Sequence, residues 1–380
     1  MKLSLELAPF AAAVADAARA LPGRPPVPVL AGLKLEAAAG QLTVAAFDYE
    51  VSAQATLAAD VADAGSVLVS GRLLSDITRT LKGKNTIDLE LDGTRLVLTS
   101  GAVRYTLHTL PLEEYPSLPK TADASGTVAG SELAAAVAQV AVAAGRDDTL
   151  PVLTGIQIEI ADGKLSLAAT DRYRFAVRRI DWKASSGTTD GQALVPAKAL
   201  LDTAKMLAGA DQVDLTLPSD QGVLGMAGPA RSTTMRALEG QLPNYKALWP
   251  TPDEFIASAV VDSEELTAAV KRVALVADRS TPIQLHFTQG ALSLTAGSSD
   301  DAQARDRIDA TFDTATGAPL TIAFNPSFLL DGLGALNAPS VIFRIVSAVK
   351  PALITGANND GSGVGEDSLS YLLMPVRLSS

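Results

Sequence analysis

The chain repeats itself. A Pro-Val-Leu-Ala-Gly segment at 28–32 returns as Pro-Val-Leu-Thr-Gly at 151–155, and Asp48 matches Asp171 with the same spacing of 123 positions. A fainter third copy begins near 283, 127 positions after the corresponding part of the second copy. A period of about 125 residues is too long for a solenoid unit and matches the size of a whole domain. The sequence therefore predicts three similar bodies in tandem.

A second block repeats in the same way. Asp76, Asp202 and Asp331 hold corresponding positions, and Arg72 of the first copy corresponds to Lys198 of the second. Each of these residues lies in a stretch with helical spacing of its apolar side chains. The predicted helices span 72–81, 198–207 and 327–336.

Linkers are expected where proline, aspartate and small residues gather, near 116–125 and 250–254. These positions divide the chain into three parts of nearly equal length. The expected domains are 1–121, 122–252 and 253–380.

Each repeat is predicted to combine two helices with many strands. Leu7, Phe10 and Val14 give the first repeat an amphipathic opening helix. Alternating apolar residues flank turns at 39–40 and 162–163, which is a hairpin pattern. Helices and strands in this order favour an α+β fold with the helices on one side of the sheets.

Composition excludes several classes of function. The chain has no cysteine, so it has no disulfides and no thiolate metal sites, and its two histidines, His108 and His286, are too few for a histidine-rich metal site. The start has no secretory pattern and no apolar run has the length of a membrane span, so we expect a cytoplasmic protein without membrane contact. The net charge of −11 argues against tight, phosphate-driven binding of nucleic acid.

Catalytic motifs are absent from the sequence pattern. The Gly-Ser-Gly-Val-Gly segment at 361–365 lacks a following lysine and helix, so a strand connection is favoured over a phosphate loop. The Asn-Asn-Asp-Gly segment at 358–361 is favoured as a turn over a calcium loop. No serine, histidine and acid follow a triad pattern. We expect a protein without enzymatic activity, metal or cofactor.

The second helices of the first two repeats carry the same charge pattern. Two cations and an aspartate recur at i, i+4 and i+7, which places them on one helical face. A solvated helix face and a weakly phosphate-binding face both fit this pattern, and the aspartates would keep phosphate contacts weak. The residues are Arg72, Asp76 and Arg79 in the first repeat and Lys198, Asp202 and Lys205 in the second.

The C-terminal segment 371–378, Tyr-Leu-Leu-Met-Pro-Val-Arg-Leu, is apolar and contains a proline. A last edge strand tolerates proline. The same segment also suits one wall of an apolar groove for a partner peptide, because methionine gives adaptable contacts.

Six segments of the chain carry recognisable motifs, at 23–25, 28–30, 153–155, 170–176, 324–326 and 374–378. In their order and spacing they resemble the beta subunit of bacterial DNA polymerase III, the sliding clamp family. The resemblance covers the whole chain, and its most specific regions are the Thr-Asp-Arg-Tyr-Arg-Phe-Ala stretch and the C-terminal ending.

The resemblance implies three domains of the DNA-clamp fold and a ring in which two chains join head to tail, domain one to domain three. Helices would line the hole. The implied function is non-catalytic: the homodimer encircles double-stranded DNA without reading its sequence and tethers the replicative polymerase for processive synthesis. Other polymerases, the clamp loader, mismatch-repair proteins and ligase would bind through short peptides that contain glutamine and leucine.

The resemblance also implies roles for surface residues. The DNA-facing residues would be Arg24, Arg72, Arg79, Lys198 and Lys205. The dimer contact would join Leu81 and Arg104 of domain one to Leu275, Asp300 and Asp301 of domain three.

By the same resemblance, a partner-peptide groove lies between domains two and three. Leu153, Phe175, Leu248 and Met374 would form its apolar floor, and Arg174 would help to orient the peptide. The full set is Leu153, Thr170, Arg172, Tyr173, Arg174, Phe175, Pro243, Leu248, Asn325, Phe328, Val349, Leu372, Met374, Pro375, Val376, Arg377 and Leu378.

The groove departs from the commonest family pattern. Arg172-Tyr173 stands where many members have Gly-His, Ala247 where some have arginine, and Pro351 where serine is frequent. These departures leave open a second interpretation, a specialised copy that confers resistance to a clamp-binding inhibitor. A third interpretation, an unrelated enzyme of triplicated domains, lacks the catalytic residues that it would need.

Overall fold

The computed structural model describes residues 1–81, 86–120, 122–185, 190–218, 222–244, 247–277, 281–297, 302–365 and 367–377. The chain packs into two compact units. Unit 1 comprises Met1–Ala134 and Trp182–Ala237, and unit 2 comprises Ala135–Asp181 and Leu238–Ser380. The second repeat therefore contributes residues to both units.

The described residues of unit 1 form three complete α-helices and, apart from β15 (Gly191–Pro196), the strands of one long sheet. The helices are α1 (Leu7–Ala17), α2 (Gly71–Thr80) and α4 (Ala197–Leu207), and α3 (Gly130–Ala141) begins in this unit. The first-repeat strands are β1 (Lys2–Glu6), β2 (Gly32–Ala38), β3 (Gln41–Phe47), β4 (Val51–Ala58), β5 (Asp60–Asp63), β6 (Gly65–Ser70), β7 (Thr86–Asp92), β8 (Arg95–Ser100) and β9 (Val103–Leu110). Those of the second repeat are β10 (Gly126–Val128), β14 (Lys183–Ala184), β15 (Gly191–Pro196), β16 (Val213–Thr216), β17 (Val223–Gly228) and β18 (Arg231–Arg236).

Unit 2 is built from the same kinds of element. Its helices are α5 (Ser263–Ala274), α6 (Pro326–Leu336) and the rest of α3. Its strands are β11 (Gly155–Ala161), β12 (Lys164–Thr170), β13 (Arg174–Asp181), β19 (Ala257–Asp262), β20 (Ile283–Thr288), β21 (Ala291–Gly297), β22 (Gln303–Asp309), β23 (Thr311–Thr314), β24 (Leu320–Phe324), β25 (Ser340–Ile345), β26 (Ala352–Ala357) and β27 (Ser370–Leu373).

Each repeat contains two three-stranded antiparallel meanders. The first meanders are β2-β3-β4, β11-β12-β13 and β20-β21-β22, and the second are β7-β8-β9, β16-β17-β18 and β25-β26-β27. The expected second helices are confirmed to within one residue at 71–80, 197–207 and 326–336. The expected hairpin turns are also confirmed, because Ala39-Gly40 and Asp162-Gly163 have the positive φ angles that tight hairpins require. The α+β fold class is therefore confirmed.

Successive repeats are joined edge to edge. In unit 1, β4 pairs with β18 from Ala55↔Arg231 to Val51↔Met235, and the buried Ser52 and Thr234 hydroxyls lie 2.6 Å apart. In unit 2, β13 pairs with β27. In both cases the last strand of a first meander meets the last strand of the next repeat's second meander. The pairing satisfies backbone groups that an open edge would leave exposed.

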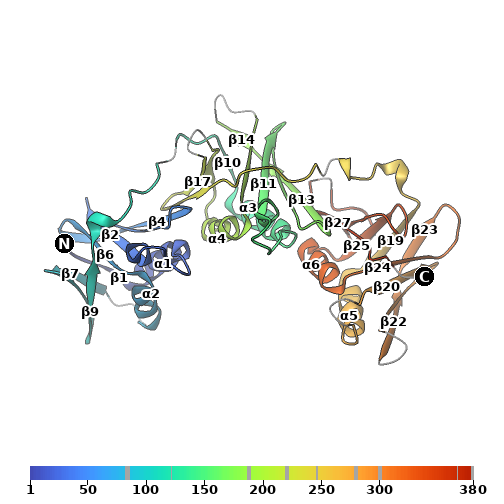
Figure 1. The fold of residues 1–380 in the computed structure, drawn as a ribbon, viewed down its shortest axis with the longest axis horizontal. Coiled ribbons are helices and arrows are strands. Elements are labelled where there is room, and N and C mark those ends of the chain that lie inside the picture. The colour runs from blue at the N-terminus through green and yellow to red at the C-terminus, as the bar shows by residue number, and fades with distance from the viewer. Residues whose placement is uncertain are drawn as a thin grey trace. The chain divides into compact units, whose positions relative to one another are not determined.

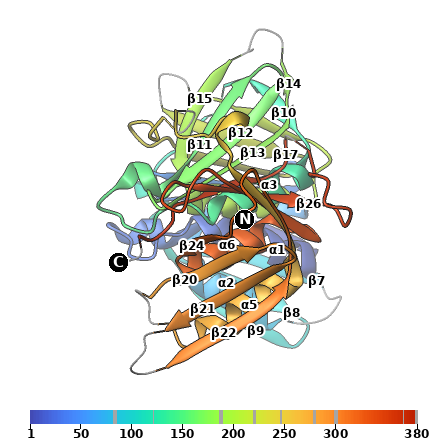
Figure 2. The same ribbon diagram turned by 90° about the vertical axis from the view of Figure 1, so that its right-hand side faces the viewer.

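The helices present apolar faces to these sheets. In α1 the buried residues Leu7, Phe10, Val14 and Ala17 follow helical spacing, and they belong to the core of the first repeat. α1 packs beside α2 and α5 beside α6, as Figures 1 and 2 show. Among the described helices, none is long and apolar enough to span a membrane.

The start and position of α6 are set by particular residues. Asn325 caps it by accepting hydrogen bonds at Oδ1 from the backbone N–H groups of Ser327 and Phe328, and Pro326 occupies the first turn. A Cβ atom at Gly332 would overlap the ring of Tyr371 in β27. Only glycine lets α6 approach the strand this closely.

Candidate functional site

A cavity of about 490 Å³ lies in unit 2 between the segment after α3, the start of β13 and the first turns of α6. Five residues of the predicted groove line it: Leu153, Arg172, Tyr173, Arg174 and Phe328. The other residues that line it are Ala144, Gly145, Arg146, Asp147, Leu150, Asp171, Ser327 and Asp331.

A turn at Asp171 orients the side chains at the start of β13. Oδ1 of Asp171 accepts hydrogen bonds from the backbone N–H groups of Tyr173 (3.0 Å) and Arg174 (3.1 Å), and Arg172 between them has a φ of 80°. A short acceptor side chain that bonds to the backbone two residues on is typical of such turns. The turn leaves Tyr173 55% exposed and buries Arg174 at 5% exposure.

Arg174 is a buried cation held by two carboxylates. Its Nε donates to Asp171 at 2.9 Å and its Nη1 donates to Asp331 at 2.6 Å, and the guanidinium lies 4.4 Å from the centre of the Phe328 ring. Burial acts to lower the pKa of Arg174, but the hydrogen bond to Asp331, with Tyr371 and Asp171 beside it, outweighs burial and raises the pKa. Arg174 therefore stays charged, and two of its donors are committed inside the protein.

Aromatic rings form one wall of the cavity. Tyr173 stacks on Phe328 with ring centroids 5.9 Å apart, so Phe328 contacts both Tyr173 and the Arg174 guanidinium. The hydroxyl of Tyr371 donates to the Phe328 carbonyl at 2.8 Å. Burial raises the pKa of Tyr371, although Arg174 acts in the opposite direction. These contacts fix the position of Phe328.

The residues expected to form the apolar floor occupy three different environments. Leu153 lines the cavity, Phe175 is buried against Trp249 and pairs in register with Leu372, and Leu248 and Met374 are exposed. Arg174 lines the cavity and the neighbouring Phe175 does not, because successive side chains of a β-strand point to opposite faces.

The tail after β27 carries further groove residues. The backbone N–H of Met374 donates to the Tyr173 carbonyl at 2.9 Å, and that of Val376 donates to the Ala323 carbonyl at 2.8 Å. Met374, Val376, Leu248 and Val349 all expose their side chains. Of the remaining predicted residues, Thr170 is buried, Asn325 caps α6, Pro243 and Arg377 are exposed, Pro375 is half-buried, and Leu378 lies outside the described residues.

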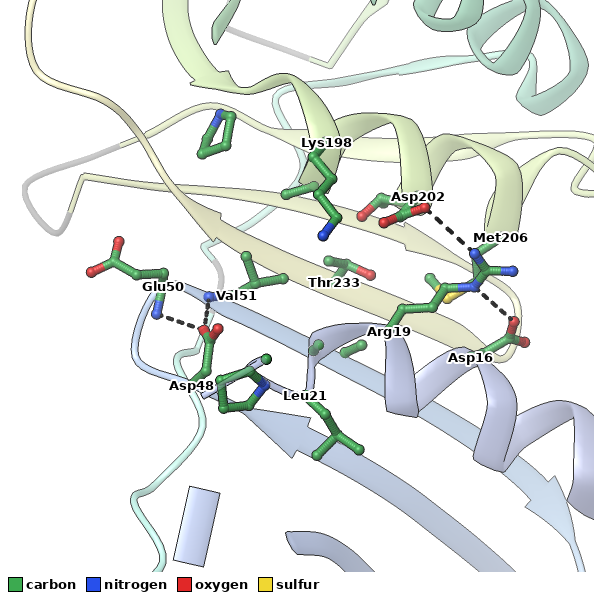
Figure 3. Close-up of a pocket in the computed structure, with 17 residues that line it drawn as sticks. Asp16, Arg19, Leu21, Asp48, Glu50, Val51, Lys198, Asp202, Met206 and Thr233 are labelled. Carbon is green, nitrogen blue, oxygen red and sulfur yellow. Dashed lines mark hydrogen bonds and ion pairs between the residues drawn. The ribbon is translucent and has the colours of Figure 1, made fainter. Parts of the chain in front are cut away.

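The five residues expected to face DNA are all exposed and all belong to unit 1. Arg72 donates to the carbonyls of Pro22 and Gly23, and Arg79 pairs with Asp76 at 3.2 Å. Lys198 points into a cavity of unit 1 (Figure 3). Arg24 and Lys205 complete the set. Some of this positive charge is therefore engaged within the protein.

Three of the five residues expected at the dimer contact lie in the described part of the chain. Arg104 is exposed on β9, and Leu81 is half-buried against the core of the first repeat. Leu275, directly after α5, is 86% exposed, a high value for a leucine. Asp300 and Asp301 lie outside the described residues.

Sequence reasoning did not find the ion-pair network around Asp16 or the position of Arg146 beside the unit 2 cavity. Asp16 binds Arg231 at 2.6 Å, and Arg19 lies between Asp16 and Asp202. The described residues contain no cluster of histidine, aspartate and glutamate that could hold a metal ion. The sequence did indicate a second aspartate turn like that at Asp171, because Asp48 matches Asp171 in the repeat.

Family models identify the whole chain. The N-terminal domain of the DNA polymerase III beta subunit matches residues 1–119, its central domain matches 127–244, and its C-terminal domain matches 250–377. The chain is 52% identical to the beta sliding clamp of Streptomyces coelicolor over the full length of both proteins. It is 41% identical to the beta sliding clamp homolog GriR of Streptomyces muensis over 99% of each.

Solved structures agree with this assignment. A crystal structure of the DNA polymerase III subunit beta from Pseudomonas aeruginosa matches with a TM-score of 0.88 and 26% identity over 100% of both chains. A second structure, of the same organism's clamp bound to griselimycin, matches with a TM-score of 0.90. The chain belongs to the family of DNA polymerase III beta subunits, the beta sliding clamps.

Proposed function

We propose that this chain is the processivity clamp of a replicative DNA polymerase. Two copies form a closed ring around double-stranded DNA, without catalytic activity of their own. Each copy contributes three domains, at 1–121, 122–252 and 253–380, and the ring works in the cytoplasm.

One observation supports the head-to-tail ring above all. Within the chain, the last strand of a first meander pairs with the last strand of the next repeat's second meander, as β4–β18 and β13–β27. By this rule two described strands find no such partner within the chain. They are β22, the last strand of the third repeat's first meander, and β9, the last strand of the first repeat's second meander. β22 is the edge of its sheet, and β9 pairs with β6 only through Thr109 and Leu110. Pairing β22 of one chain with β9 of another extends the rule between chains.

The residues beside these edges suit such a contact. Arg104 on β9 and the exposed Leu275 after α5 provide one charged and one apolar group. Together with Leu81, Asp300 and Asp301 they form the proposed dimer contact. Unpaired edges are otherwise a hazard for aggregation, which a closed ring removes.

The proposed DNA contacts are few and weak. Arg24, Arg72, Arg79, Lys198 and Lys205 would meet phosphates without reading sequence. Topology would hold the ring on DNA, which agrees with a chain of net charge −11.

The proposed partner groove of unit 2 combines the 490 Å³ cavity with the exposed side chains of Leu248, Val349, Met374 and Val376. Exposed apolar side chains and a cavity are features of peptide-binding surfaces. Replicative and other polymerases, the clamp loader, mismatch-repair proteins and ligase would compete for it through short peptides.

Retention on circular DNA tests this function. With clamp loader and ATP, the protein should remain bound to a nicked circular plasmid and be lost when the plasmid is cut once. Equal retention on the linear and circular forms would mean ordinary surface binding. A protein that is monomeric and retained on neither form would contradict the ring.

A specialised copy that confers resistance to a clamp-binding inhibitor is the second candidate, because the groove departs from the commonest family pattern at Arg172, Tyr173, Ala247 and Pro351. The identity of 52% to the Streptomyces coelicolor clamp favours the replicative function. Affinity for a peptide from the host polymerase separates the two candidates. A replicative clamp should bind the peptide, whereas a specialised copy should bind it more weakly than the host's other clamp does.

A further inference from the structure

A loop of unit 1 at residues 22–26 carries Arg24, one of the proposed DNA contacts. Before the loop, Leu21 packs against the core of the first repeat, and after it Leu30 is fully buried. Between these two anchors, residues 23–28 are exposed. The loop therefore holds a cation out from the domain on a short arm that is fixed at both ends.

The composition of the loop leaves it few restraints of its own. Pro22, Pro25 and Pro26 have no backbone N–H group, so they cannot donate hydrogen bonds. Their rings also restrict φ on both sides of Arg24, which leaves Gly23 as the residue with the most conformational freedom. A Cβ atom at Gly23 would meet nothing within 4 Å, so packing does not restrain this residue either. The loop should therefore bend most easily at Gly23.

Arg72, in the first turn of α2, binds the loop on both sides of this point. Its Nη2 donates to the Pro22 carbonyl at 3.2 Å and to the Gly23 carbonyl at 2.6 Å. Among the described residues, residues 22–26 make no other hydrogen bond. The start of α2 lies against the base of the loop, because a Cβ atom at Gly71 would come within 2.6 Å of the Leu21 side chain. Arg72 is therefore well placed to fix the loop.

The equivalent loop of the second repeat does not need such a residue. The spacing of 123 positions carries Arg24 onto Asp147. Oδ1 of Asp147 accepts hydrogen bonds from the backbone N–H of Thr149 at 3.0 Å and from its hydroxyl at 2.7 Å, and the Leu150 N–H donates to the Asp147 carbonyl at 3.0 Å. That loop closes its own turn, whereas the loop of the first repeat is held by a side chain from outside.

We propose that Arg72 is a positioning residue for DNA binding, which holds loop 22–26 so that Arg24 is presented to the DNA backbone. This inference rests on the proposed function, in which both arginines face DNA. Because Nη2 of Arg72 is committed to two carbonyls, fewer of its donors remain for phosphates. Without Arg72, each DNA contact of Arg24 would have to order the loop first, at a cost in entropy. Most of the effect of Arg72 on DNA affinity is therefore transmitted through Arg24.

A spin label on the loop tests whether Arg72 fixes it. The chain has no cysteine, so Gly23→Cys provides a single attachment point, at a position with open space around it. We would attach a nitroxide to the full-length protein and record its EPR spectrum without DNA. Arg72→Ala should sharpen the lines, because the loop loses its two described hydrogen bonds. The matched control, Arg79→Ala, should leave the spectrum unchanged, because Arg79 binds Asp76 and Ser75 of its own helix.

A double-mutant cycle tests whether the effect on DNA passes through Arg24. Fluorescence anisotropy would measure the affinity for a short linear duplex at low salt, which can enter a ring by its end without a loader. Arg24→Ala should weaken binding about fivefold and Arg72→Ala about threefold. In the Arg24→Ala background, Arg72→Ala should add less than about 1.5-fold. Arg79→Ala, which does not touch the loop, should weaken binding by the same factor in both backgrounds.

Arg72→Lys separates the charge of this residue from its position. Lysine keeps the positive charge on the helix face, but its compact ammonium on a shorter side chain does not reproduce the guanidinium that spans the two carbonyls. Arg72→Lys should therefore recover only a minor part of the affinity that Arg72→Ala loses, and the label on the loop should remain mobile. Full recovery of affinity in Arg72→Lys would assign Arg72 a direct phosphate contact and overturn the proposal.

Three further outcomes would overturn the proposal. They are an unchanged EPR spectrum in Arg72→Ala, equal losses of affinity from Arg72→Ala with and without Arg24, and no effect of Arg24→Ala on affinity. The proposed clamp function fails in a different experiment, when the unsubstituted protein is not retained on circular DNA. In that case the EPR spectra would still show whether Arg72 holds the loop, so the two failures are distinguishable.

Discussion

The turns at Asp48 and Asp171 share one backbone and hold different side chains. Each aspartate accepts two backbone N–H groups, and each is followed by a residue with positive φ, 75° at Tyr49 and 80° at Arg172. Yet the second turn leads into the buried Arg174 and an aromatic wall, whereas the first leads into Val51 and the exposed Glu50, which pairs with Arg236 at 3.6 Å. The repeat therefore conserves a scaffold of hydrogen bonds, and the chemistry is set by a few side chains placed on it.

Packing of the second helix on the neighbouring strand shows the same principle. In unit 2, Gly332 of α6 faces Tyr371 of β27. The corresponding positions in unit 1 are Thr203 of α4 and Thr233 of β18, and both threonines are buried. Two medium side chains in one unit thus replace the smallest residue and a large ring in the other. Cores accept such exchanges when the total volume is kept.

The largest difference between the two units is expected at Arg174. Arg174→Leu should lower the free energy of unfolding by about 3 kcal/mol, because it leaves Asp171 and Asp331 without their cation. Val51→Leu at the corresponding position of unit 1 should cost less than about 1 kcal/mol. Urea denaturation of the full-length protein measures both, and equal losses would show that the two positions are not chemically distinct.

The exchange of volume between the units can be tested by a double-mutant cycle. Gly332→Thr alone should cost about 2 kcal/mol because the new side chain meets the Tyr371 ring. Adding Tyr371→Thr should recover some of that loss, since it recreates the pair found in unit 1. Strictly additive losses in thermal or urea unfolding would argue against a shared packing constraint.

Substitution by asparagine should change the free energy of unfolding more at Asp171 than at Asp48. Asp171→Asn keeps the turn but weakens the bond from Arg174, and should cost about 1.5 kcal/mol. Asp48→Asn keeps the turn and loses no described ion pair, so its effect should stay within about 0.5 kcal/mol. A larger loss at Asp48 than at Asp171 in the same unfolding assay would reverse the comparison.

The smallest effect is expected at the residues with positive φ. Arg172→Gly should stabilise the protein by about 0.5 kcal/mol, because relief of backbone strain slightly exceeds the entropy that glycine loses on folding. Tyr49→Gly should show no gain, since it also loses the edge-to-face contact of Tyr49 with Phe47. Melting temperatures that rise equally in both variants would contradict this distinction.

The sequence predicts much of the scaffold. The spacing of 123 positions places hairpin turns at 39–40 and 162–163 and matches Asp48 to Asp171, because the repeats keep the residues that such turns require. The sequence did not predict the ion pairs of Arg174. Asp331 lies 157 positions away, and an arginine in an alternating strand is usually exposed. The burial of Phe175 against Trp249 likewise depends on which face of β13 the intervening loop covers.

The proposed ring would open where β22 of one chain meets β9 of the other. A ring of two chains closed by β22–β9 pairing has two identical seams. When one seam opens, the other keeps the chains tethered, so reclosure is a unimolecular event at a high effective concentration. In the proposed ring, a loader would therefore have to separate only one seam to admit DNA, and the two chains would not dissociate and dilute.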